Sequence, residues 1–226
     1  PGVRGDDPPG GVGPGRGNAP PWPPEAHHHM RIIGGRYGGR HIKVMEAVGL
    51  RPATGRVREA LFSMLAARGL VFAGARVLDL FAGSGGVGIE ALSRGAALAL
   101  FVERQTAVAK VLRENLASLG IPAGQGRVMQ GDVAKVLPRL AGQTFDLVAI
   151  DPPYGQGLAA PTLAALVATG LVAEEGLVVA EVEAGLDLPE PAGLECLANR
   201  TYGQTRIFVW RLDTAASRSI PEPLIP

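Results

Sequence analysis

Short apolar runs alternate with helical stretches through most of the chain. Seven runs have the length and composition of strands: residues 76–81, 97–103, 127–130, 145–150, 177–183, 194–199 and 205–212. Between the first five, apolar residues recur at the spacing of one helix face, as Val108 and Leu112 do within residues 106–119. Alternating strands and helices predict an α/β fold whose parallel sheet carries helices on both faces. The last two runs lie close together and predict an antiparallel hairpin.

A different pattern precedes residue 75. Residues 31–35 and 40–44 resemble strands and flank a glycine-rich turn, which predicts a hairpin. A helix is expected to follow, with Thr54 as its cap and with Val57 and Leu61 at helical spacing. This segment is strongly basic, and we expect its cations to contact RNA phosphate. The candidate RNA-binding residues are Arg31, Arg36, Arg40, Lys43, Arg51, Arg56 and Arg58.

Composition sets the outer bounds. The chain has 226 residues, of which 46% are hydrophobic, and this suits one α/β domain with appendages. We expect a disordered leader rich in Gly and Pro, a basic extension, the α/β domain and a flexible tail, at residues 1–29, 30–74, 75–212 and 213–226. Three histidines at 27–29 fall in that leader, so we expect no metal site. The single cysteine, Cys196, cannot form an internal disulfide, which favours a reducing cytoplasm. The lack of an apolar stretch long enough to span a bilayer argues against a membrane protein.

Residues 76–88 are typical of a buried strand, a glycine-rich turn and the start of a helix. Gly83 and Gly85 allow the backbone to take positive φ and to approach a ligand closely. The spacing of Gly83, Gly85 and Gly88 also fits the dinucleotide fingerprint, so an NAD-dependent enzyme is one alternative. An acid inside the strand end, Asp79, counts against that alternative, as does a second motif further along the chain.

Acids also follow the next strands. Glu103 ends the second strand about 20 residues after the glycine turn, where a carboxylate accepts hydrogen bonds from both hydroxyls of a ribose. Asp132 follows the third strand, where the adenine of the same nucleoside would lie. Together with Asp79 and Asp151 they place an acid at four strand ends. In an open parallel sheet such ends meet in one crevice.

The second motif is Asp-Pro-Pro-Tyr at residues 151–154, directly after an apolar run. Two prolines cannot continue a sheet, so the strand must stop there. The loop presents the Asp151 carboxylate, the Pro152 carbonyl and the Tyr154 ring together. An enzyme needs this combination to hold the exocyclic amine of a planar base and to stack on its face. The alternative is a strand terminator beside a surface tyrosine.

With these motifs the chain resembles the bacterial 16S ribosomal RNA guanine-N2 methyltransferases, the small-subunit methyltransferase D family. The resemblance is carried by residues 31–40, 50–62, 78–85, 151–154 and 202–206. The glycine turn and Asp-Pro-Pro-Tyr occur in many amino-methylating enzymes, whereas the two basic amino-terminal stretches are much more specific to the family. Gln105 departs from the family pattern, which has Asp at that position.

The resemblance implies a Rossmann-like class I methyltransferase fold, with a seven-stranded, mostly parallel sheet, a carboxy-terminal antiparallel hairpin and a small basic hairpin-helix extension. It implies S-adenosylmethionine as methyl donor and a guanine N2 in 16S rRNA as acceptor, within the small ribosomal subunit or an assembly intermediate. We expect a monomer. The expected catalytic residues are Asp151, Pro152 and Tyr154. The expected cofactor-binding residues are Asp79, Phe81, Gly83, Gly85, Glu103, Asp132 and Asp151.

Two other classes stay open. One is the same chemistry on another amine: a 23S rRNA guanine, a DNA adenine or cytosine, or a protein glutamine. Such enzymes share the glycine turn and a Pro-Pro-Tyr motif but often begin that motif with Asn and lack the arginine-rich extension. The other class is a non-catalytic nucleic-acid-binding protein with a degenerate cofactor fold. It is disfavoured because every expected cofactor and catalytic position is filled.

Overall fold

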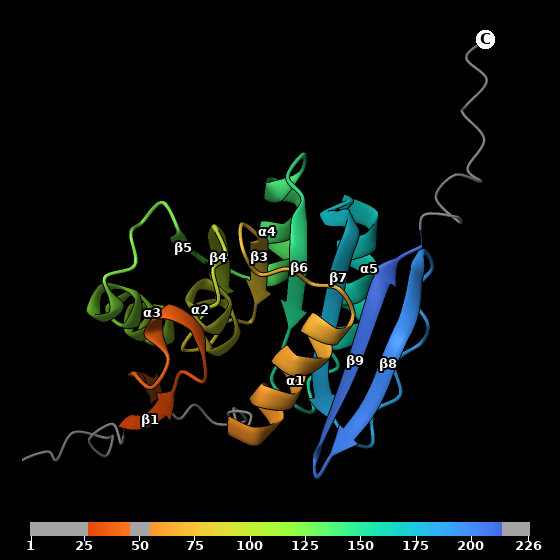
Figure 1. Cartoon of the computed structure of the whole chain (residues 1–226). Coiled ribbons are helices and arrows are strands. Elements are labelled where there is room, and N and C mark those ends of the chain that lie inside the picture. The colour runs from red at the N-terminus through yellow and green to blue at the C-terminus, as the bar shows by residue number, and fades with distance from the viewer. Residues whose placement is uncertain (1–26, 46–54, 214–226) are drawn as a thin grey trace, which may run out of the picture.

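The computed structural model describes residues 27–45 and 55–213, and a seven-stranded sheet forms its centre (Figure 1). The order across this sheet is β5, β4, β3, β6, β7, β9, β8. The strands are β3 (Arg76–Leu80), β4 (Leu98–Glu103), β5 (Gly126–Gln130), β6 (Phe145–Ile150), β7 (Val172–Glu183), β8 (Leu194–Tyr202) and β9 (Thr205–Leu212). Neighbours from β5 to β7 are parallel, and β9 is antiparallel to both β7 and β8. The predicted mostly parallel sheet with an antiparallel end is confirmed.

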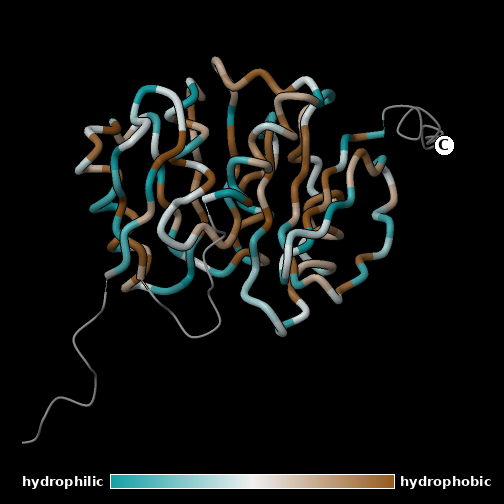
Figure 2. Tube along the Cα trace, turned by 60° about the horizontal axis from the view of Figure 1, so that its bottom comes forward, coloured by the Kyte–Doolittle hydropathy of each residue, from teal (hydrophilic) through white to brown (hydrophobic). Residues whose placement is uncertain are grey.

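Helices cover both faces of this sheet. The first face carries α1 (Gly55–Ala67), α2 (Gly86–Ser93) and α3 (Thr106–Leu119), and the second carries α4 (Val133–Val136), the 3₁₀ turn η2 (Leu137–Leu140) and α5 (Ala159–Thr169). Successive strand residues point to opposite faces, so Val77 packs in the first hydrophobic cluster and Leu78 in the second. The hydrophobic residues follow the central strands in Figure 2. Within the described ranges, no helix is both long and apolar enough to cross a bilayer.

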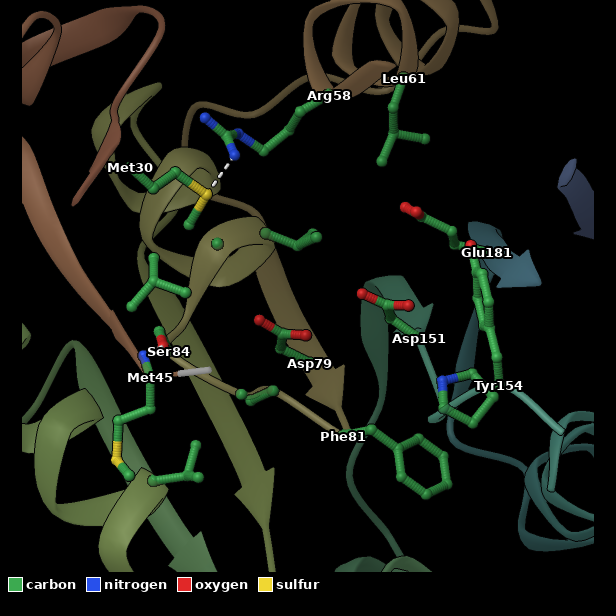
Figure 3. A pocket seen from close by; sticks show the side chains of 17 residues that line it. Met30, Met45, Arg58, Leu61, Asp79, Phe81, Ser84, Asp151, Tyr154 and Glu181 are labelled. Atoms are coloured by element: carbon green, nitrogen blue, oxygen red, sulfur yellow. Dashed lines mark hydrogen bonds between the residues drawn. The ribbon is translucent and has the colours of Figure 1, made fainter. Parts of the chain in front are cut away.

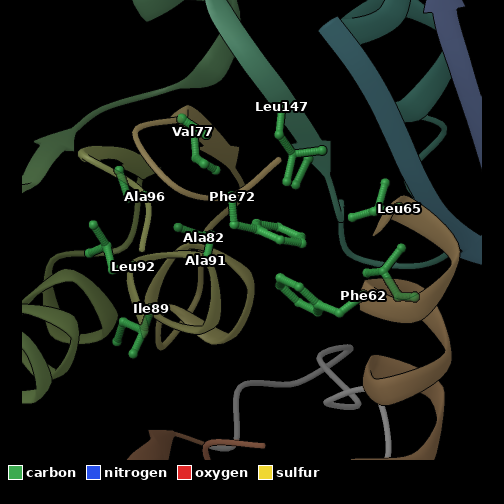
Figure 4. Packing of buried hydrophobic residues seen from close by; sticks show 14 of the residues in the cluster. Phe62, Leu65, Phe72, Val77, Ala82, Ile89, Ala91, Leu92, Ala96 and Leu147 are labelled. Atoms are coloured by element: carbon green, nitrogen blue, oxygen red, sulfur yellow. The ribbon is translucent and has the colours of Figure 1, made fainter. Parts of the chain in front are cut away.

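Aromatic packing fixes α1 against the rest of the first cluster. Phe62 and Leu65 on α1 are fully buried, and the Phe62 ring centroid lies 5.3 Å from that of Phe72 (Figure 4). The Arg94 guanidinium lies over the Phe62 ring at 4.8 Å, where a cation is attracted to the ring face. The apolar face of α1 therefore sets the position of the helix. This position in turn determines where the polar side chains of α1 point.

The amino-terminal extension forms the predicted hairpin, with different strand bounds. β1 (His27–Arg31) pairs antiparallel with β2 (His41–Met45), and the 3₁₀ turn η1 (Gly35–Tyr37) lies between them. The assignment of residues 27–29 to a disordered leader was therefore wrong, because they form most of β1. Residues 32–35, predicted to be strand, are not in β1, since the N–H groups of Ile33 and Gly34 donate to the Glu90 carboxylate instead. The predicted helix cap, Thr54, lies outside the described residues.

Buried polar side chains attach this hairpin to α2 and α3. Glu90, 1% exposed, accepts the two N–H groups at 2.8 and 3.0 Å. Ser93 Oγ accepts the Tyr37 N–H at 2.9 Å. Asn115 accepts the Lys43 N–H at 2.9 Å and donates to the carbonyls of Lys43 and Ser84 at 2.9 and 3.0 Å. Because Ser84 belongs to the glycine turn that follows β3, Asn115 connects the hairpin to the carboxyl-terminal edge of the sheet.

Candidate active site

Acidic residues from neighbouring strands meet at one edge of the sheet. Asp79 lies near the end of β3, Glu103 ends β4, and Asp151 directly follows β6. Asp132 follows β5 and is exposed. These four strands are parallel neighbours in the order β5, β4, β3, β6. The structure therefore brings all four predicted acids to the same edge of the sheet.

The glycine turn after β3 is held by a buried carboxylate. Asp79, 2% exposed, accepts the Gly88 N–H at 2.8 Å and so fixes the first turn of α2. Gly83 and Gly85 have φ of 54° and 93°, as predicted from their role in a tight turn. A Cβ on Gly85 would lie 2.5 Å from Leu112 Cδ1, so both backbone conformation and close packing require glycine there.

Glu103 holds the same turn from the next strand. Its carboxylate accepts the N–H groups of Gly83 at 3.1 Å and Gln105 at 2.7 Å. A cavity opens beside it, which we call the Glu103 cavity. Its lining includes Phe81, Val102, Glu103, Asp132, Val133 and Pro153. Asp132 also caps α4, accepting the Ala134 N–H at 3.0 Å.

A second cavity, the Asp151 cavity, is shown in Figure 3, and Phe81 lines both cavities. Its polar lining is Arg58, Asp79, Ser84, Asp151, Tyr154 and Glu181. Pro152 faces this cavity and Pro153 faces the Glu103 cavity. The two prolines thus place one rigid loop across the border between the cavities, where a group bound in one can reach a molecule bound in the other.

The carboxylates of the Asp151 cavity have raised pKa values. Burial raises the pKa of Asp79 to about 7, against the opposing effect of the Gly88 N–H. Burial, followed by the charges of Glu181 and Asp79, raises the pKa of Asp151 well above its usual range. Burial raises the pKa of Glu181 to about 7, although the Arg58 charge lowers it. Such crowding of acids in a cleft is typical of functional sites.

Tyr154 forms one wall of the Asp151 cavity. Its hydroxyl and Thr205 Oγ1, at the start of β9, are 3.0 Å apart, which fixes the ring in the cavity. Burial raises the pKa of Tyr154, so the phenol is neutral and offers its ring face. The loop that follows is anchored as well, because the Gly155 N–H donates to Glu183 at 3.2 Å.

The predicted RNA-binding cations do not share one environment. Arg31, Arg36, Arg40, Lys43 and Arg56 are exposed, and Arg51 lies outside the described residues. Arg40 donates to the Ser118 carbonyl at 2.6 Å, and Lys43 pairs with Glu114 at 3.1 Å, so both also attach β2 to α3. Arg58 is 4% exposed and donates to the Arg31 carbonyl at 2.6 Å and to Met30 Sδ. Its assignment as a phosphate contact was wrong, because its guanidinium faces the Asp151 cavity and not the surface.

Glu181 is the site residue that sequence reasoning missed. It lies on β7, where Ala180 is in register with Ile150 of β6, and therefore stands beside Asp151. The signal was present in the sequence, since Glu181 is an acid inside the apolar run of residues 177–182. An acid at such a position is buried in the sheet and needs a reason to be there.

Comparison with known proteins gives consistent results. The family model described as conserved hypothetical protein 95 matches residues 30–211. Ribosomal RNA small subunit methyltransferase D of Escherichia coli K12 is 42% identical over 176 residues, covering 77% of this chain and 86% of that protein. The protein of the same name from Haemophilus influenzae is 34% identical over 181 residues, covering 80% and 92%. A solved hypothetical protein of Thermus thermophilus superposes with a TM-score of 0.69 at 35% identity, covering 81% of this chain and 99% of that one.

Proposed function

The chain belongs to the conserved hypothetical protein 95 family, and from this premise we propose that it transfers a methyl group from S-adenosylmethionine to the exocyclic N2 of a guanine in 16S rRNA. The observation that carries the proposal is the pair of cavities that Phe81 lines, with Asp151 and Pro152 at their border. One cavity suits the nucleoside of the methyl donor, and the other suits a flat base with an amino group.

The residues of the Glu103 cavity fit S-adenosylmethionine. Val102 and Val133 give apolar walls for an adenine, and Asp132 lies where its amino group would be. The Glu103 oxygens retain acceptor capacity for two ribose hydroxyls, since a carboxylate oxygen accepts more than one hydrogen bond. A Cβ on Gly83 would meet only the Phe81 carbonyl, at 4.0 Å, so the backbone is open to the ligand there. Asp79 and Gly83 line the Asp151 cavity next to Phe81, so we expect the amino-acid end of the donor to extend into that cavity and its ammonium group to meet Asp79.

When bound, S-adenosylmethionine supplies an electrophilic methyl carbon, and the protein has to position the amine in line with it. The Asp151 carboxylate and the Pro152 carbonyl accept hydrogen bonds from the guanine N2, which directs its lone pair toward the methyl group. Tyr154 stacks on the base. The amine loses one proton after transfer. Asp151, with its raised pKa, is suited to accept that proton once it is ionised.

The proposal also covers the RNA contacts, the localisation, the oligomeric state and the domain organisation of the protein. The exposed cations of the hairpin and of α1 contact rRNA phosphate in the small subunit or an assembly intermediate. The enzyme acts as a cytoplasmic monomer. Residues 30–74 form the RNA-docking part, and residues 75–212 form the methyltransferase domain. Residues 1–26 of the predicted leader and residues 214–226 of the predicted tail lie outside the described residues.

A nucleoside analysis tests this function. Cells without the protein should lose N2-methylguanosine from one position of 16S rRNA, detected by mass spectrometry, and the purified protein should restore it in vitro. Methyl transfer instead to 23S rRNA, DNA or a protein glutamine would contradict the substrate assignment.

Asp151→Ala tests the chemistry in the same assay. It should lower the single-turnover rate by at least about 100-fold, because the acceptor that orients the amine is removed while S-adenosylmethionine affinity is retained. A rate near that of the wild type would assign Asp151 a structural role only.

A further inference from the structure

Glu181 is a buried carboxylate that faces the Asp151 cavity without a hydrogen bond. It is 7% exposed, and among the described residues its oxygens accept no hydrogen bond. The other two buried carboxylates at this edge differ, since Asp79 accepts the Gly88 N–H and Glu103 accepts two N–H groups. The Glu181 oxygens are open to the cavity, so they are available to accept a hydrogen bond from a ligand bound there.

The direction of Glu181 narrows the kind of ligand. In Figure 3 its carboxylate points into the same space as that of Asp151, with the Tyr154 ring at the wall. Two neighbouring carboxylates repel each other when the cavity is empty. A ligand that offers two adjacent hydrogen-bond donors would satisfy both. Guanine has this arrangement, because N1–H and the N2 amine are neighbours on its Watson–Crick edge.

We propose that the Glu181 carboxylate accepts the N1–H of the target guanine, beside the N2 amine held by Asp151, and that it is a specificity-determining residue. This inference rests on the proposed function. Adenine presents a lone pair at N1, which a carboxylate repels, so Glu181 would exclude adenine as well as favour guanine. Recognition of a flipped base through its Watson–Crick edge is the general strategy of base-modifying enzymes.

Arg58 is the positioning residue for Glu181. Its guanidinium is buried, is held by the Arg31 carbonyl and Met30 Sδ, and faces the same cavity. Its positive charge favours the ionised form of Glu181, the form that accepts a hydrogen bond. The hairpin therefore contributes to base recognition through Arg58 without touching the base.

A base analogue tests whether Glu181 recognises the N1–H of the base. Once the target position is mapped, the RNA substrate is made with guanine or with 2-aminopurine there. 2-Aminopurine keeps the N2 amine but has a lone pair at N1. The wild type should prefer guanine by about 100-fold in kcat/KM, the upper end of the effect expected when an acceptor in a buried site loses its donor. Glu181→Gln should reduce this preference by at least about tenfold, because its amide can donate to the N1 lone pair.

Controls separate the outcomes. Glu174→Gln, an exposed position at the other end of β7, should leave the preference unchanged. Glu181→Asp, which keeps the charge, should lower kcat/KM for guanine but keep the preference, and it serves if the glutamine variant does not fold. An unchanged preference for guanine in folded Glu181→Gln overturns the inference. A loss of S-adenosylhomocysteine affinity with the preference intact overturns it as well, because Glu181 would then bind the cofactor and not the base. If the wild type transfers no methyl group to guanine, the proposed function itself fails.

Discussion

Phe81 stands where the two cavities meet and has a left-handed backbone, with φ of 60°. Among the described residues it is the one non-glycine residue with positive φ. For a bulky side chain this conformation costs on the order of 1 kcal/mol and persists only where the surroundings impose it. Here the backbone turns sharply at the end of β3, and this turn lets the Phe81 side chain line both cavities.

Glu103 should control cofactor affinity, because its carboxylate lines the Glu103 cavity and also holds the glycine turn. Glu103→Ala removes the proposed acceptor for the ribose and also the partner of the Gly83 N–H, so S-adenosylhomocysteine should bind at least about tenfold more weakly. Isothermal titration calorimetry measures this affinity. The control is Glu174→Gln, which lies far along another strand. An unchanged affinity in folded Glu103→Ala would remove this residue from the cofactor site.

Glu181 should make stability depend on pH in the direction set by its raised pKa. The pKa is about 7 in the folded protein against an ordinary value of 4.5, so the folded state binds the proton more tightly. The contribution of Glu181 to stability is full below pH 4.5 and is lost as the pH rises through 7. Glu181→Gln should therefore gain stability relative to the wild type at pH 8 and lose this advantage at pH 4.5. Urea unfolding at the two pH values measures it, and a difference independent of pH would contradict the assignment.

At the scale of elements, the hairpin of β1 and β2 is attached by polar side chains as well as by its apolar residues in the first cluster, Ile32, Tyr37 and Ile42. Asn115 acts on Lys43 of β2 as a neighbouring strand would, accepting its N–H and donating to its carbonyl. The Glu90 carboxylate accepts the two N–H groups that precede η1. Since Met30 lines the Asp151 cavity and contacts Arg58, the placement of this hairpin sets one wall of the site.

Asn115→Ala should loosen the hairpin. It leaves the Lys43 N–H and two carbonyls without their partner, which should cost about 1–3 kcal/mol of unfolding free energy. Methyl transfer should fall more than S-adenosylhomocysteine affinity, because the hairpin borders the Asp151 cavity. Chemical denaturation and single-turnover transfer measure the two effects. Ser118→Ala, one turn later on α3, is the matched control. Equal losses in both variants would contradict a specific role for Asn115.

The elements show what the sequence determines. The carboxyl ends of neighbouring parallel strands lie at the same edge of a sheet, independent of the loops that follow them. Asp79, Glu103 and Asp151 could therefore be grouped from their positions at strand ends alone. The importance of Glu181 depends on β7 being the neighbour of β6, which is set by the packing of the whole sheet. Arg58 was misassigned because its neighbours along the chain are basic, whereas its burial results from contacts with β1, formed by residues 27 positions earlier.

At the scale of the molecule, positive charge is concentrated on the extension, while the net charge of the chain is only +1. Arg36 is the clearest probe of this charge. It is exposed and stacks on Tyr37 at 5.2 Å, whereas Arg40 and Lys43 also hold the hairpin to α3. A variant of either of those two would mix attachment with RNA contact.

Arg36→Ala should therefore weaken RNA binding and lower the slope of log affinity against log salt by about 1, with cofactor affinity preserved. Filter binding of 16S rRNA over a salt series measures this slope. Arg139→Ala, a basic residue on η2 at the opposite face of the sheet, is the control. An unchanged slope would mean that Arg36 makes no phosphate contact.

The order of strands in the sheet has a consequence for the growing chain on the ribosome. β9 lies between β7 and β8, so β8 is synthesised before the strand that joins it to the sheet. β9 also supplies Thr205 to the Tyr154 hydroxyl and Ile207 to the backbone of Glu181. The donor side of the site, built on β3 to β6, is thus translated first, and the acceptor side is completed only when residue 212 emerges. We therefore expect no methyl transfer from a nascent chain in which β9 has not yet joined the sheet.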